Sequence, residues 1–145
     1  MIGCCVVLPS GHAIAIVDER VRISMSKIVL VDDSQADLKL LEGYLKEAQH
    51  TVVTFADTEN LEDKLAKEMP DVVVLDVVMA GRNGFQACRD IRNNNDVKHI
   101  PVILCTSKGQ ESDRFWGQQQ GANGYLVKPV KSADLLIAVK KVALH

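Results

Sequence analysis

The stretch of sequence that decides the fold is 28–34, which reads IVLVDDS. An uninterrupted apolar run rich in β-branched residues predicts a strand, and it is typical of a strand buried on both faces of a parallel sheet. The run ends in two acids, and Ser34 with Asp37 three residues later resembles a helix-capping box. The stretch therefore predicts a strand that ends in acidic residues and leads directly into a helix.

Similar apolar runs recur along the chain at 52–55, 72–75, 101–105 and 125–127. Segments with apolar residues at helical spacing follow each run; the first has Leu38, Leu41 and Leu45, with Leu40 and Tyr44 widening the stripe. A regular alternation of strand and helix favours a parallel sheet covered on both faces. We therefore predict an α/β fold, a flavodoxin-like, doubly wound, five-stranded parallel sheet of order 2-1-3-4-5 with five helices.

Composition excludes several classes of protein. The 145 residues include 17 Lys and Arg against 19 Asp and Glu, a formal net charge of −2, which argues against binding to nucleic acid. The apolar run at 2–9 is too short to span a bilayer, so we expect no membrane insertion. The four cysteines show no C-x-x-C spacing, and we expect a cytoplasmic protein.

Residues 1–24 do not join the strand–helix pattern, and Met25 stands just before the first strand, as a start codon would. The segment 13–17 has the composition of a strand, but nothing around it in the sequence supplies an evident partner. We expect 1–24 to be an N-terminal extension, either non-native or disordered, and 25–145 to be the folded domain.

Acidic residues follow two strands that are neighbours in the predicted sheet: Asp32 and Asp33 after the first strand, Asp76 after the third. Sites in open α/β sheets form at this position, beyond the carboxyl ends of the strands where the strand order reverses. Helix capping explains one nearby acid, but it does not explain two adjacent acids facing a third. Converging carboxylates repel one another unless a cation neutralises them, and oxygen ligands suit Mg²⁺. We predict a magnesium site.

Two further strand ends complete the predicted site. Thr106 follows the fourth strand, and Lys128 follows the fifth. Each is common at a strand end, but together they place a hydroxyl and an ammonium beside a metal-bound carboxylate. This arrangement favours a phosphoryl group that Asp76 attacks as a nucleophile. A flavin site is disfavoured, because the acids would repel the cofactor phosphate.

From Met25 onward the sequence resembles the receiver domains of two-component response regulators. The matching stretches are VLVDDS at 29–34, DVVM at 76–79 leading to NGF at 83–85, TS at 106–107 and GANGYLVKP at 121–129. The resemblance implies a phosphorelay in which Asp76 accepts a phosphoryl group from the phosphohistidine of a sensor histidine kinase.

The resemblance also implies roles for the other residues. Asp33, Asp76 and the Val78 backbone carbonyl would ligate Mg²⁺, with Asp32 acting mainly through water. Lys128 would pair with the phosphoryl oxygens, and the Lys128–Pro129 bond would be cis. Thr106 would move to hydrogen-bond the phosphoryl group, and Tyr125 would change rotamer to follow.

Three further positions concern the segment after Asp76 and the lifetime of the phosphoryl group. Ala80 stands where the family usually has proline. The family suggests that the positions of Val78 and Lys108 tune how fast the phosphoryl group is lost, in a direction that the sequence leaves open.

A more specific resemblance lies in 83–87, 110–113 and 116–122, which are similar to single-domain receivers of type IV pilus chemosensory systems, serving twitching motility or phototaxis. Trp116 lies in this region, and the sequence leaves open whether it is a core residue or an exposed partner-binding residue.

The helix that begins at Ser132 is the last in the sequence, so we expect no output domain. We expect signalling through a downstream target protein, which binds the face formed by the fourth helix, the fifth strand and the fifth helix around Tyr125. Two alternatives use the same fold: an adaptor that binds partners regardless of phosphorylation, and a phosphate sink that drains a kinase. We do not expect a turnover enzyme, because no further general acid or base is apparent beside Asp76.

Overall fold

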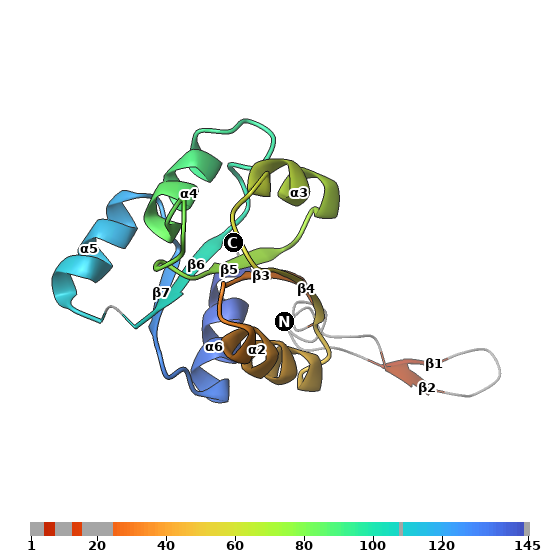
Figure 1. Ribbon diagram of the computed structural model, residues 1–145. Helices are drawn as coiled ribbons and strands as arrows, with labels where there is room; N and C mark the ends of the chain where they lie inside the picture. Colours follow the sequence, from red (N-terminus) through yellow and green to blue (C-terminus); the bar gives the residue numbers. More distant parts are fainter. Residues whose placement is uncertain (1–4, 8–12, 16–24, 108, 144–145) are drawn as a thin grey trace.

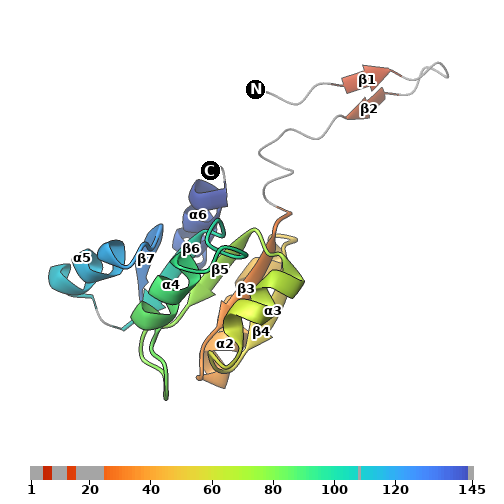
Figure 2. The same cartoon turned by 90° about the horizontal axis from the view of Figure 1, so that it is seen from above.

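A computed structural model describes residues 5–7, 13–15, 25–107 and 109–143 of the chain. Its main feature is a parallel five-stranded sheet of order β4-β3-β5-β6-β7, with helices on both faces (Figures 1 and 2). The strands are β3 (Lys27–Val31), β4 (Thr51–Phe55), β5 (Val72–Leu75), β6 (Val102–Thr106) and β7 (Gly124–Val127). The helices are α2 (Gln35–Glu47), α3 (Leu61–Glu68), α4 (Gly84–Arg92), α5 (Glu111–Gln119) and α6 (Ser132–Ala143). The predicted fold is confirmed, and none of the described helices is both long and apolar enough to cross a bilayer.

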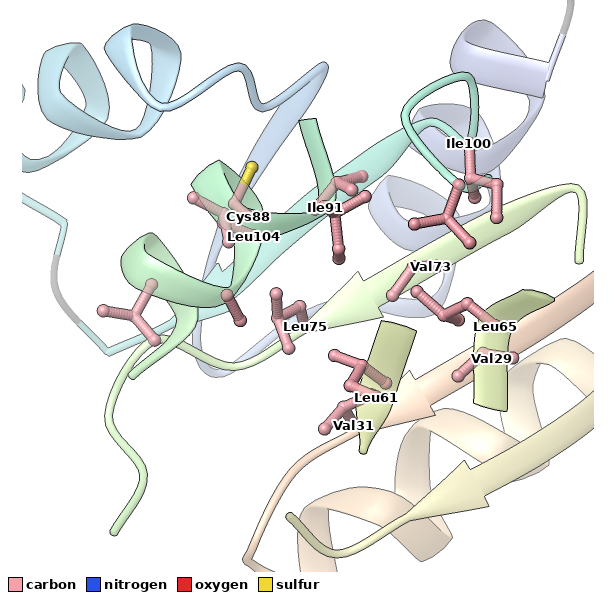
Figure 3. Packing of buried hydrophobic residues seen from close by; sticks show 14 of the residues in the cluster. Val29, Val31, Leu61, Leu65, Val73, Leu75, Cys88, Ile91, Ile100 and Leu104 are labelled. Carbon is pink, nitrogen blue, oxygen red and sulfur yellow. The ribbon is translucent and has the colours of Figure 1, made fainter. Parts of the chain in front are cut away.

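Two apolar layers hold the sheet between its helices. Side chains alternate between the faces of a strand, so Val29 and Val31 of β3 pack with α3 and α4, whereas Ile28 and Leu30 pack with α2 and α6. Figure 3 shows the first layer, in which Leu61 and other aliphatic side chains fill the space between β3, β5, α3 and α4. Burying one such large side chain contributes about 1.5–3 kcal/mol. Burial on both faces explains the uninterrupted apolar run that the sequence shows.

Helix α2 begins where the sequence predicts. The side chain of Ser34 caps it by accepting a hydrogen bond from the Asp37 backbone N–H at 3.3 Å. Leu38, Leu41 and Leu45 are buried against the sheet. The prediction that Leu40 widens this stripe is wrong: it is 46% exposed, because its place in the helical turn directs it away from the sheet.

A short ribbon lies within the segment that the sequence places outside the domain. Strand β1 (Cys5–Val7) pairs antiparallel with β2 (Ala13–Ala15), with Cys5 opposite Ala15. The expectation that 13–17 has no partner is therefore wrong for Ala13–Ala15. The partner is a second short apolar run, separated from it by residues that include Pro9 and Gly11. That 1–24 forms an extension outside the domain stays a prediction.

Candidate functional site

Three carboxylates meet at the carboxyl end of the sheet. One oxygen each from Asp32, Asp33 and Asp76 lie within 4.8 Å of one another. The pairing of β3 with β5 brings them together, since Val31 and Leu75, the last residues of these strands, are partners in register. Backbone hydrogen bonds continue past the strand ends: the Asp76 N–H donates to the Val31 carbonyl at 2.9 Å. The convergence expected from the sequence is thus a consequence of strand order.

The three acids differ in exposure. Asp32 and Asp76 are 3% and 6% exposed, whereas Asp33 is exposed. Burial, and after it the neighbouring charge of Asp32, raises the pKa of Asp76 to about 6, although Lys128 opposes the shift. Unneutralised negative charge is therefore unfavourable here, and a bound cation would relieve it.

Lys128 supplies positive charge to the same cluster. Its Nζ lies 2.7 Å from Asp32 Oδ2, 2.8 Å from Asp37 Oδ2 and 3.6 Å from Asp76 Oδ1. Burial opposes the charge, but hydrogen bonds to Asp32 and Asp37 raise the pKa of Lys128 overall. The ammonium is thus held in its charged form beside Asp76. The sequence analysis missed Asp37, which it interpreted only as part of a capping box.

The backbone of the β6 and β7 ends fixes where Lys128 stands. The Lys128 N–H donates to the Thr106 carbonyl at 2.8 Å, and the Lys128–Pro129 bond is cis, as the resemblance implies. Thr106 is the last residue of β6 rather than the residue after it, and it is fully buried. In the sheet it stands opposite Val127 of the neighbouring strand β7.

Tyr125 connects β7 to helix α5. It is half-buried, its ring lies 5.4 Å from the guanidinium carbon of Arg114, and burial raises its pKa. Gly117 lets α5 approach, because a Cβ there would stand 3.2 Å from the Tyr125 ring and 3.0 Å from Leu104. A change in the Tyr125 rotamer would therefore alter the packing of α5 against β7.

Two further predicted residues, Val78 and Ala80, lie in the connection between β5 and α4, which we call the 76–83 loop. Val78 and Ala80 are exposed in this loop, and the Gly84 N–H closes it by donating to the Val77 carbonyl at 2.9 Å. The predicted lifetime-tuning residue Lys108 lies outside the described residues. Val78 thus lies two residues after Asp76, in a loop that a hydrogen bond ties to the start of α4.

The donor set fits a hard divalent cation. Carboxylate oxygens dominate, and no His or Cys joins the described acidic cluster, which favours Mg²⁺ over softer metals. The exposed Asp33 marks the side that water can reach, and Mg²⁺ usually keeps several water ligands. Asp33, Asp76 and the Val78 carbonyl are the groups that could hold it.

Comparison with known families decides the identity. Residues 28–140 match the response regulator receiver domain. The chain belongs to this family. Receiver domains are the signalling switches of two-component systems, and this receiver has the acidic cluster at which members of the family bind Mg²⁺.

Relatives extend this picture. Protein PilH of Pseudomonas aeruginosa is 42% identical over 121 residues, which cover 81% of this receiver and 98% of PilH. A putative response regulator from Chloroflexus aurantiacus superposes with a TM-score of 0.79 at 29% identity, covering 83% of this chain and 98% of that one. The receiver domain of the sensor histidine kinase PA1611 from Pseudomonas aeruginosa has a TM-score of 0.75 at 26% identity, with the same coverage, and holds a magnesium ion in its active-site cleft. The match with PilH confirms the resemblance to receivers of the pilus type.

Proposed function

We propose that this receiver accepts a phosphoryl group on the Asp76 carboxylate from the phosphohistidine of a sensor histidine kinase, with Mg²⁺, and then signals by binding another protein. The observation that carries the proposal is the surrounding of Asp76. A fixed ammonium lies 3.6 Å from its Oδ1, and two further carboxylates stand within metal-binding distance. A buried nucleophile between a cation and a metal site is suited to phosphoryl transfer.

The chemistry is a displacement at phosphorus. An Asp76 carboxylate oxygen attacks, the O–P bond forms as the N–P bond of the phosphohistidine breaks, and the departing imidazole keeps the electron pair and takes up a proton. Asp33, Asp76 and the Val78 carbonyl would hold Mg²⁺, which would supply positive charge to offset that of the phosphoryl oxygens. Lys128 needs to move little to reach the new phosphoryl group, because its ammonium already lies beside the Asp76 carboxylate.

The signal passes from the site toward α5. Thr106 turns toward the phosphoryl group, and Tyr125 on the neighbouring strand follows, so that phosphorylation favours one of two packings. Between α5, β7 and α6 lies a groove of about 480 Å³, lined by residues that include Arg114, Tyr125 and Ile137. We assign target binding to this face.

Exposed apolar side chains on α5 and α6 support that assignment. Phe115 is 60% exposed, Trp116 51% and Ile137 64%. Of the two interpretations of Trp116, a core residue or an exposed one, the structure supports the exposed one. Apolar side chains left in water on a small protein are typical of a binding surface.

The similarity to PilH and to pilus-type receivers supports a place in type IV pilus motility or taxis, in the cytoplasm, with a histidine kinase upstream and a motor or pilus component as target. The two alternatives remain separable by experiment. An adaptor would bind its target equally well with and without phosphorylation, whereas a phosphate sink would drain the kinase without binding a target.

Incubation with a small phosphodonor tests the proposal. Wild type with Mg²⁺ should gain one phosphoryl group by intact-protein mass spectrometry, and chelation of Mg²⁺ should prevent the gain. Asp76→Asn should not be labelled, while Asp63→Asn, on the exposed side of α3, should be labelled like wild type. Labelling of Asp76→Asn at the wild-type rate would show that the assignment is wrong.

A further inference from the structure

Arg82 ties the 76–83 loop to three other parts of the fold. Its Nη1 and Nη2 donate to the Glu62 carboxylate of α3 at 3.0 and 2.7 Å, and Nη1 also donates to Asp90 Oδ2 of α4 at 3.0 Å. Nη2 donates to the Thr58 carbonyl at 2.7 Å, and the Thr58 hydroxyl donates back to the Arg82 carbonyl at 3.2 Å. We call these contacts the Arg82 clamp.

The Arg82 clamp is partly buried rather than fully exposed on the surface. The side chains of Arg82 and Glu62 are 21% and 24% exposed, and Arg82 lowers the pKa of Glu62 by hydrogen bonding to it. A forked guanidinium–carboxylate pair fixes orientation as well as distance, so it can hold a backbone segment in one place.

The clamped loop is the one that carries the proposed metal ligand. Val78 and Ala80 are exposed, and Gly81 has a positive φ of 77°. The buried Met79 anchors the loop between Val78 and Ala80, and Arg82 anchors it directly after Gly81. Ala80 lacks the ring that the usual proline would use to restrict the backbone here.

We propose that Arg82 is a positioning residue for the metal site, and that its clamp holds the 76–83 loop in the conformation that presents the Val78 carbonyl to Mg²⁺. The inference rests on the proposed Mg²⁺-dependent function. Two acids surround one guanidinium, so the clamp carries a net negative charge and does not repel a cation.

Charge alone predicts the opposite result, and this makes the inference testable. Removal of a positive side chain near a cation site strengthens cation binding by Coulomb's law. Loss of a ligand-positioning contact weakens it, by about tenfold in metal affinity. We therefore expect Arg82→Met to bind Mg²⁺ about tenfold more weakly than wild type.

The test is Mg²⁺ titration by calorimetry on full-length protein, at a temperature at which circular dichroism shows every variant to be folded. Arg89→Met, which removes an exposed arginine from α4, is the matched control and should keep the wild-type affinity. Arg82→Lys keeps the charge but loses the fork, so it should bind Mg²⁺ less tightly than wild type.

A double-variant cycle shows whether Arg82 acts through Glu62. Glu62→Gln should weaken Mg²⁺ binding, and adding it to Arg82→Met should weaken binding no further, because the contact between Glu62 and Arg82 is already lost in that variant. Wild-type affinity in folded Arg82→Met would overturn the inference while leaving the proposed function intact. Failure of wild type itself to bind Mg²⁺ would overturn the proposed function and the inference with it.

Discussion

Asp76 meets two opposing demands. It must be ionised to act as a nucleophile, yet it is 6% exposed and lies beside Asp32, so burial and repulsion favour its neutral form. Lys128 offsets part of this effect, and a bound cation would offset more. In the protein without metal, ionising the proposed phosphoryl acceptor therefore costs free energy.

Replacing Asp76 with asparagine should reveal this cost as a gain in stability without metal. Because folding raises the pKa of Asp76 to about 6, protonation favours the folded state. That contribution is complete below the ordinary carboxyl pKa and is lost as the pH rises through about 6. In a chelating buffer, Asp76→Asn should be more stable than wild type by about 1–3 kcal/mol above this pH.

Urea denaturation well below and well above the Asp76 pKa measures the difference. It should be small at the lower pH, and saturating Mg²⁺ should abolish it at the higher pH by stabilising wild type. A difference that is the same at both pH values would contradict the explanation.

The residues of the site were predictable to different degrees. Asp32, Asp33, Asp76, Thr106 and Lys128 stand at strand ends, so strand order alone brings them to one edge of the sheet. Asp37 and Arg82 were not predicted as members of a network, because most of their partners belong to other elements of the fold. A pair such as Asp37 with Lys128, 91 residues apart, depends on how α2 sits against the end of β7.

At the scale of elements, the start of α4 is packed against the backbone of Asp76 and Val77. A Cβ at Gly84 would stand 2.2 Å from the Asp76 carbonyl oxygen and 2.8 Å from the Val77 Cα. Neither atom belongs to a flexible side chain, so the backbone itself would have to move. Glycine at this position lets the 76–83 loop close tightly.

Gly84→Ala should therefore destabilise the protein by about 2 kcal/mol or more, because overpacking forces a backbone shift. Gly43→Ala is the matched control: Gly43 lies within α2, and nothing stands within 4 Å of the added Cβ. That change should stabilise the protein by about 0.5–1 kcal/mol. Thermal denaturation of both variants tests the contrast, and equal effects would refute it.

The boundaries of the five strands of the sheet were predicted to within one residue, and the small errors have local causes. The observed β6 omits Pro101, which has no N–H to donate to a strand ladder. It includes Thr106, which is polar and so falls outside the apolar run. Lys27 similarly extends β3, since it pairs in register with Thr51 despite its charge. Apolar runs mark the buried centre of a strand better than its ends.

At the scale of the whole molecule, the site and the proposed docking face meet at the neighbouring strands β6 and β7. Thr106 ends β6 next to Lys128 of the site, Tyr125 of β7 lines the docking groove, and Gly117 places α5 against the Tyr125 ring. Trp116, the only tryptophan in the chain, neighbours this contact. It can therefore report a change that begins at Asp76.

Phosphorylation should change the fluorescence of Trp116, and Thr106→Ala should remove this change while still accepting the phosphoryl group. The alanine lacks the hydroxyl that would hydrogen-bond the phosphoryl oxygens. Residue 106 would then not turn toward the phosphoryl group, and Tyr125 would keep its rotamer. Thr106→Ser, which keeps the hydroxyl, should respond like wild type. An unchanged fluorescence response in phosphorylated Thr106→Ala would exclude this route.

The central claim is that Asp76, and no other acid of the cluster, carries the phosphoryl group. Borohydride reduction converts an aspartyl phosphate to homoserine, which peptide mapping by mass spectrometry locates. After treatment with a phosphodonor and Mg²⁺, the account predicts homoserine at position 76 alone. Homoserine at position 32 or 33, or none at 76 in a protein that has gained a phosphoryl group, would contradict it.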